Sequence, residues 1–126
     1  MAYSDVIFSA LDFTAAGDLS DEQYTFVSRT TGKTVDQTGA GEAAVGVLWN
    51  APAAAGRAAT VVVKGRPHVY VGTGGVSDGD AIASDADGQA VTATTDDVVI
   101  GIALADAGAG ELVQIDLLAD PQYTSA

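Results

Sequence analysis

The stretch Ala44-Val45-Gly46-Val47-Leu48 returns later in the chain as Val99-Ile100-Gly101-Ile102-Ala103, with a glycine at the centre of an apolar run in both places. Runs of Val, Ile and Leu between turn residues are typical of short, buried β-strands. A glycine weakens a strand unless the backbone bends there or another element approaches closely. The two stretches therefore predict equivalent strands in a repeated structure, each with a kink or bulge at its glycine.

Two further matches flank this pattern in the same order. Upstream, Phe26-Val27-Ser28 and the glycine turn after it line up with Ile82-Ala83-Ser84 and its own glycine turn. Downstream, a small-residue loop that ends at Gly56 lines up with one that ends at Gly110, and an apolar strand follows each loop. Matches in register at several places indicate an internal repeat.

The composition supports an all-β fold made of two repeat units, at about residues 24–65 and 81–118. Hydrophobic residues make up 48% of the chain but aromatic residues only 6%, and 15 glycines separate the apolar runs. Turn signals recur about every eight to twelve residues, as they do in small sandwiches and barrels. Because a chain of 126 residues suits one domain, we predict one β domain over residues 19–118, a small β-barrel or sandwich.

Segments outside the repeat units are predicted at both ends of the chain, an extended N-terminal arm over residues 1–18 and a C-terminal tail over residues 119–126. The apolar side chains of the arm are those of Val6, Ile7, Phe8, Leu11 and Phe13. Chain ends fray unless something holds them. Two interpretations stay open: the arm pairs with the sheet of its own chain, or it is an adhesive segment that a partner orders. Since both repeat units lie downstream, we expect them to fold without the arm.

The charge of the chain is strongly acidic. Asp and Glu number 17 against five Lys and Arg, which gives a formal net charge of −12 and a pI near 4.1. The cations are spread among carboxylates, at Arg29, Lys33, Arg57, Lys64 and Arg66. Nucleic acids and anionic membranes need clustered Lys and Arg, so we predict neither partner. The N-terminus lacks the pattern of a secretory signal and no stretch suits a membrane helix, so we expect a soluble protein.

Candidate catalytic residues are few. The chain has no cysteine and a single histidine, His68, for which no Ser or Cys partner is indicated. Asp78, Asp80, Asp85 and Asp87 offer oxygen ligands of the kind calcium takes, but no bidentate Glu follows at the required spacing, and Asp-Gly pairs are common turn formers. The turn interpretation is favoured and calcium binding stays open. We predict no catalytic, cofactor-binding or metal-ligating residue, and no enzyme.

The single tryptophan, Trp49, stands at the end of the first glycine-containing strand. Its counterpart in the second unit is Leu104, so the position is apolar in both units. We interpret Trp49 as a core residue or an interface anchor, because a sugar-binding cleft would need further aromatic residues beside it.

Several stretches of the sequence resemble the small capsid decoration, or cement, proteins of tailed bacteriophages. The resemblance covers about residues 14–118, and the stretches that carry it include Ala15-Ala16-Gly17-Asp18-Leu19-Ser20, Gly39-Ala40-Gly41-Glu42, Gly56-Arg57-Ala58-Ala59-Thr60 and Ile82-Ala83-Ser84-Asp85. It implies a small, β-tulip-like fold that binds the outside of a mature capsid as a homotrimer, with an N-terminal arm on the major capsid protein. Here the arm would be residues 2–13, and the family brings no catalytic residue.

One function and two alternatives follow. We expect a structural decoration protein on the capsid exterior of a virion, which stabilises the shell by joining neighbouring subunits and whose negative charge keeps the particle soluble. The first alternative is an extracellular β-sandwich module that binds a carbohydrate or a host surface, which a cluster of exposed aromatic residues would favour. The second is a small hydrolase, which the lack of His, Ser and Cys partners disfavours.

Overall fold

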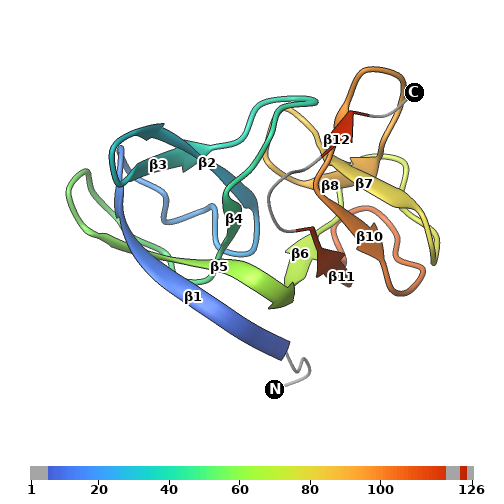
Figure 1. Cartoon of the computed structure of the whole chain (residues 1–126), viewed down its shortest axis with the longest axis horizontal. Helices are drawn as coiled ribbons and strands as arrows, with labels where there is room; N and C mark the ends of the chain where they lie inside the picture. Colours follow the sequence, from blue (N-terminus) through green and yellow to red (C-terminus); the bar gives the residue numbers. More distant parts are fainter. Residues whose placement is uncertain (1–5, 119–122, 125–126) are drawn as a thin grey trace.

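The structure, a computed structural model, describes residues 6–118 and 123–124 and confirms the all-β fold (Figure 1). No helix occurs among these residues. The described part of the chain therefore contains no helix that could cross a membrane. The strands are β1 (Val6–Ala15), β2 (Phe26–Thr31), β3 (Thr34–Gln37), β4 (Gly46–Leu48), β5 (Ala58–Arg66), β6 (His68–Tyr70), β7 (Ala81–Ser84), β8 (Ala90–Thr92), β9 (Val98–Val99), β10 (Gly101–Ala103), β11 (Leu112–Leu117) and β12 (Tyr123–Thr124).

The first five strands form a closed barrel. They hydrogen-bond in the order β1-β3-β2-β4-β5, and β1 also pairs with β5, which closes the ring. β1 runs antiparallel to β5 from Val6 opposite Arg66 to Thr14 opposite Ala58. Its last residues, Thr14 and Ala15, also pair in parallel with β3.

Five later strands repeat this arrangement. β11, β10, β7 and β8 are neighbours in the same order as β5, β4, β2 and β3. β6 pairs antiparallel with β11, as β1 does with β5. A parallel bridge between Val71 and Ala90 joins the end of β6 to β8, as Ala15 and Val35 join β1 to β3. Apart from β9 and β12, which pair with each other, the described strands therefore form two five-stranded units in tandem, with Pro67 between them.

Loop hydrogen bonds show the same equivalence. The Gly56 N–H donates to the Ala15 carbonyl over 2.9 Å, and the Gly110 N–H donates to the Val71 carbonyl over 2.8 Å. The two loop glycines matched in the sequence thus hold the same position against equivalent strands.

Each barrel encloses apolar side chains from equivalent positions. The core of the first barrel consists of Ala15, Leu19, Val27, Val35, Leu48, Ala59 and Val61. The corresponding residues of the second barrel, in the same order, are Val71, Val76, Ile82, Ala90, Ala103, Val113 and Ile115. Full burial of a Val, Leu or Ile side chain stabilises a fold by about 1.5–3 kcal/mol, so the same positions stabilise both units.

The observed repeat differs from the predicted one in two ways: where the first unit begins, and which residues of β2 and β7 correspond. Residues 6–15 pair with their own sheet, the first of the two open interpretations, and β1 is the counterpart of β6. The first unit therefore includes this strand. Val27 pairs with Gly46 as Ile82 pairs with Gly101, so Val27, and not Phe26, corresponds to Ile82.

Close approach of the neighbouring strand explains the two central glycines. A Cβ on Gly46 would overlap the carbonyl oxygen of Val62, and a Cβ on Gly101 would lie 2.9 Å from the carbonyl oxygen of Asp116. The register of β4 and β10 is regular at these residues, and neither has a positive φ. The described pairing therefore shows no bulge at either glycine, and close approach of the neighbouring strand accounts for both.

The barrels meet at several places. β5 pairs with β11 at Gly65 and Leu117, the Gly41 N–H donates to the Ser84 carbonyl, and the start of β2 lies against the β7–β8 hairpin. The Phe26 N–H donates to the Gly88 carbonyl over 2.7 Å, and the Tyr70 N–H donates to the Tyr24 carbonyl over 2.9 Å. Phe26 is fully buried and belongs to the core cluster of the second barrel. Figure 1 shows the two barrels side by side, with β1 to β5 on the left and β7 to β11 on the right.

Candidate binding surfaces

The residues predicted to contact a partner lie on β1. Leu11 is 50% exposed, whereas Phe13 is half-buried and packs against the core of the first barrel. Val6, Ile7 and Phe8 contribute their backbone to β1, and their side chains lie outside the described part of the structure. Among the described side chains of this set, Leu11 is therefore the one available to a partner.

β1 also offers backbone hydrogen-bonding groups. Within the described residues, its segment 6–13 pairs with β5 on one side and with no strand on the other. Figure 1 shows this part of β1 extending beyond the barrel toward the N-terminus. An open edge of an apolar strand is a place where another chain can add a strand.

Trp49 and Leu104 are equivalent and exposed. The Trp49 N–H donates to the Thr60 carbonyl over 2.8 Å, and the Leu104 N–H donates to the Gln114 carbonyl over 3.0 Å. The two side chains are 42% and 37% exposed. Of the two interpretations of Trp49, the structure therefore favours the interface anchor over the core residue.

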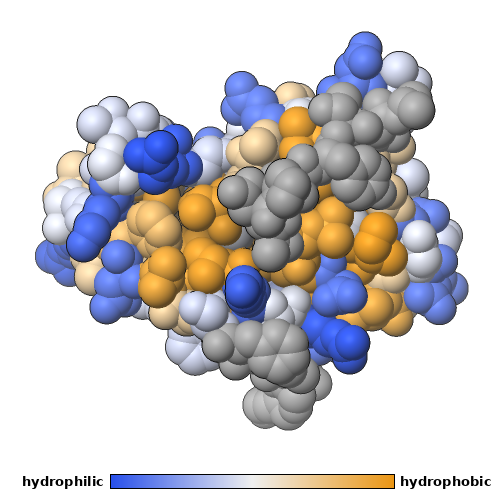
Figure 2. Space-filling model, viewed as in Figure 1, coloured by the Kyte–Doolittle hydropathy of each residue, from blue (hydrophilic) through white to orange (hydrophobic). Residues whose placement is uncertain are grey.

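Apolar residues gather across the centre of the face shown in Figure 2, over β5 and β10. Half-buried apolar side chains on these strands include Val63 and Ile102. Contiguous apolar surface of this kind marks interaction sites more often than scattered apolar residues do.

An acidic hollow of about 550 Å³ lies between the barrels. Its lining residues are Asp21, Glu22 and Thr25 from the first barrel and Tyr70, Asp87, Gln89 and Gly110 from the second. The Tyr70 ring lies 6.2 Å from that of Tyr24, tilted by 54°. Burial, and then the charges of Asp87, Asp21 and Asp36, raise the pKa of Glu22. The hollow presents hydrogen-bond acceptors and one aromatic ring, groups that suit a hydroxyl-bearing ligand. Its lining residues do not include a nucleophile with a base beside it.

Two of the four aspartates considered as calcium ligands, Asp80 and Asp85, hold turns through their carboxylates. An Asp80 Oδ2 accepts hydrogen bonds from Ser77 N and Thr92 Oγ1, and Asp85 Oδ1 accepts them from the N–H groups of Asp87 and Gln89. No group of three or more metal-ligating side chains occurs within residues 6–118 and 123–124.

His68 lies on β6 opposite Gln114 and is 8% exposed. It is the structural counterpart of Asp12 on β1, since β6 and β1 are equivalent strands. Its position in the sheet gives it a structural place in the fold.

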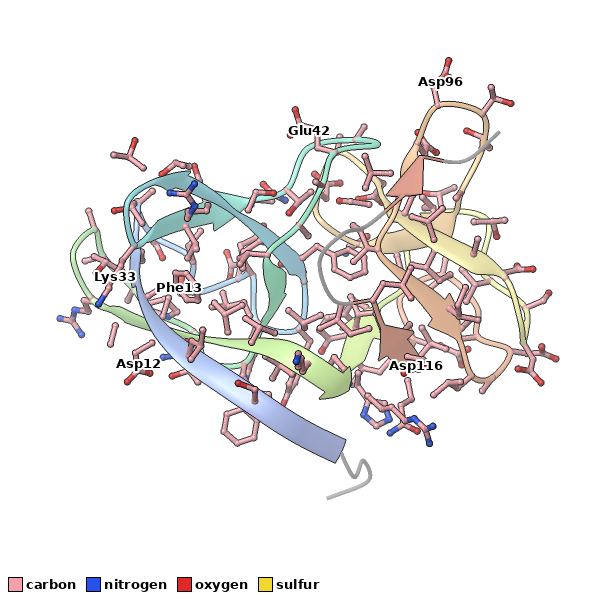
Figure 3. All side chains as sticks on the ribbon, viewed as in Figure 1. Asp12, Phe13, Lys33, Glu42, Asp96 and Asp116 are labelled. Atoms are coloured by element: carbon pink, nitrogen blue, oxygen red, sulfur yellow. The ribbon has the colours of Figure 1, made fainter. Side chains whose placement is uncertain are left out.

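The charges are divided unequally between the barrels, which the sequence analysis missed. All five Lys and Arg lie between residues 29 and 66, so the second barrel has none. Its described carboxylates are those of Asp78, Asp80, Asp85, Asp87, Asp96, Asp97, Asp106, Glu111 and Asp116. Figure 3 shows Lys33 at the end of the first barrel that is remote from the second, and Asp96 on the opposite side of the molecule. The sequence shows where the Lys and Arg residues lie, but the unequal division of charge becomes visible only once the boundary between the barrels is known.

Comparison with known proteins adds a likeness of fold. No protein-family model matches the chain, and no curated protein matches its sequence significantly. Among solved structures, the chain is similar to the N base of head fiber gp8.5 in bacteriophage phi29, with a TM-score of 0.72 and 17% sequence identity over 87% of this chain and 93% of that chain. The two proteins therefore share a fold along almost their whole lengths.

Proposed function

We propose that this chain is a non-enzymatic structural protein of a bacteriophage virion and that it binds the outer surface of the capsid. The observation that carries the proposal is the fold that it shares with the base of a phage head fibre, which covers 87% of this chain and 93% of the other. The sequence resemblance to capsid decoration proteins supports the same placement.

Within that role we propose a decoration, or cement, function. The chain would bind the major capsid protein as a homotrimer and stabilise the shell by joining neighbouring subunits, because contacts to several subunits add avidity without new kinds of contact. The net charge of −12 supports an outward position, since like charges keep particles apart in solution.

For the capsid contact we propose β1, with the apolar positions Val6, Ile7, Phe8, Leu11 and Phe13. The exposed side chain of Leu11 and the open edge of residues 6–13 support this choice. Because Phe13 packs into the barrel, its contribution is to hold the strand in place while Leu11 and the strand edge meet the shell.

The test is co-sedimentation of the purified chain with mature, undecorated shells of the phage that encodes it. We expect the unaltered chain to bind and Leu11→Ser to bind about tenfold more weakly, since removal of a buried apolar contact typically costs about 1–2 kcal/mol. Val91→Ser, at a half-buried apolar residue on β8 of the second barrel, is the matched control and should bind like the unaltered chain. Failure of the unaltered chain to bind any shell would refute the function, and equal losses in both variants would refute the role of β1.

The hollow beside Tyr70 supports a second candidate, a module that binds a carbohydrate. Carboxylates and Gln89 would accept and donate hydrogen bonds to sugar hydroxyls while the Tyr70 ring packs on the sugar. Glycan-array binding that disappears in Tyr70→Ala, together with no binding to shells, would favour this candidate over the capsid role.

A further inference from the structure

One part of the contact between the two barrels joins two unlike faces. The second barrel uses its hairpin end, defined here as the β7–β8 turn (residues 85–89) with the loop that ends at Gly110. The first barrel uses its strand side, defined as the start of β2 with the loop before it (residues 21–26). The Phe26 N–H to Gly88 carbonyl hydrogen bond of 2.7 Å joins these two faces.

The equivalent faces on the outside of the molecule are open. The hairpin end of the first barrel is the β2–β3 turn with the loop that ends at Gly56, and the strand side of the second barrel is the segment 76–81. A Cβ added at Gly32, Gly56 or Gly79 would meet no atom within 4 Å. Lys33 and Arg57 on the first face and Asp78 on the second are exposed.

Backbone hydrogen bonds bring the two cations of the open hairpin end together. The Thr14 N–H donates to the Lys33 carbonyl over 2.7 Å, and the next residue, Ala15, donates to the Arg57 carbonyl over 2.9 Å. Lys33 and Arg57 therefore flank the end of β1 on its two sides, and Figure 3 shows Lys33 pointing away from the second barrel.

Charge distinguishes the open faces from the faces already joined. Within the chain, Glu22 and Asp21 of the strand side lie beside Asp87 of the hairpin end, and their mutual repulsion contributes to the raised pKa of Glu22. The two open faces carry charges of opposite sign. The open hairpin end is positive: Lys33 is the counterpart of Gly88, and Arg57 is the counterpart of Glu111. The open strand side is negative, since it carries Asp78 and Asp80.

We propose that copies of this chain associate head to tail, with the hairpin end of the first barrel of one copy against the strand side of the second barrel of the next. The contact uses, between copies, the counterparts of one pair of faces that meets inside the chain. Asp80 is held ready by hydrogen bonds from Ser77 N (2.9 Å) and Thr92 Oγ1 (3.0 Å), which lowers the cost of ordering its carboxylate on binding.

The contact between copies is more polar than the one inside the chain. Ala81 stands where the first barrel has Phe26, and the side chain of Lys33 occupies space that Gly88 leaves empty, so the faces meet at a greater separation. Electrostatic attraction then supplies most of the affinity, and salt weakens it. Because the two faces differ, the association is heterologous and yields a closed ring or an open filament. The proposal does not depend on a capsid.

Sedimentation velocity of the full chain over a range of concentrations tests this proposal. At low ionic strength, about 20 mM, we expect species larger than the monomer, and at about 500 mM salt we expect them to dissociate. Arg57→Glu and Asp78→Lys should each weaken association about tenfold or more, and an equimolar mixture of the two variants should restore it, since the reversed faces are complementary. Lys64→Glu makes the same charge change on β5, outside both faces, and should associate like the unaltered chain.

Three results would overturn the proposal. One is a chain that stays monomeric up to about 1 mM at low ionic strength, since a specific contact weaker than that has no measurable occupancy. Another is a loss of association in Lys64→Glu as large as that in Arg57→Glu. The third is a mixture of Arg57→Glu and Asp78→Lys that associates no better than either variant alone.

Discussion

Gly46 has no room for a side chain, because a Cβ there would overlap the backbone of β5. We expect Gly46→Ala to lower the free energy of unfolding by about 2–4 kcal/mol, and Gly101→Ala, where the same atom would lie 2.9 Å from the Asp116 oxygen, by about 1–2 kcal/mol. Gly17→Ala is the matched control, since no atom lies within 4 Å of its Cβ position. Urea denaturation measures all three, and equal losses at Gly17 and Gly46 would contradict the account.

A second single residue, Glu22, makes the free energy of unfolding depend on pH. Burial and then the neighbouring charges of Asp87 and Asp21 raise its pKa above the usual 4.5. The folded state therefore binds the proton more tightly than the unfolded state, so ionised Glu22 destabilises the fold above its folded pKa and contributes nothing well below 4.5. We expect Glu22→Gln to raise the melting temperature by about 1–3 °C at neutral pH and to leave it unchanged near pH 3. A gain that persists at pH 3 would assign the effect to something other than this titration.

β1 is required by the first barrel, although the repeat units were expected to fold without it. It pairs with β5 from Val6 to Thr14 and supplies Phe13 and Ala15 to the core. We expect deletion of residues 2–13 to abolish the cooperative unfolding of the first barrel and to promote aggregation through the exposed edge of β5. Circular dichroism and hydrogen exchange measure this, with Leu11→Ser as the folded control. Native protection of β2 to β5 in the deletion variant would show that β1 is dispensable.

At the scale of elements, the sequence predicted where strands lie more accurately than it predicted how the strands of the two repeat units align. The glycine-centred runs and the loop glycines Gly56 and Gly110 were placed correctly because each marks a point where backbones approach or turn. The hairpins were misaligned by one residue because Gly32 and Gly88 were matched as turn glycines, whereas the pairing register makes Lys33 the counterpart of Gly88. β1 and β6 escaped detection as a pair because β1 is much longer and both depend on long-range pairing, which local sequence does not encode.

In the whole molecule, two equivalent barrels differ in charge and in what they expose. The hydrophobic pattern predicted one all-β domain and an apolar N-terminal arm that includes Leu11, but it did not show that all five cations gather on one barrel or that Glu22 and Tyr70 share a hollow. Both features arise from the way that the barrels pack, with residues far apart in the sequence brought together. The site could therefore be predicted only in part from the sequence.

Electron cryomicroscopy of mature virions of the phage that encodes this chain tests the central claim most directly. The account predicts density on the outer surface of the shell that fits two adjoining five-stranded barrels and that disappears from virions made without the chain. Identical outer surfaces in the two kinds of virion, or density for the chain inside the shell, would contradict it.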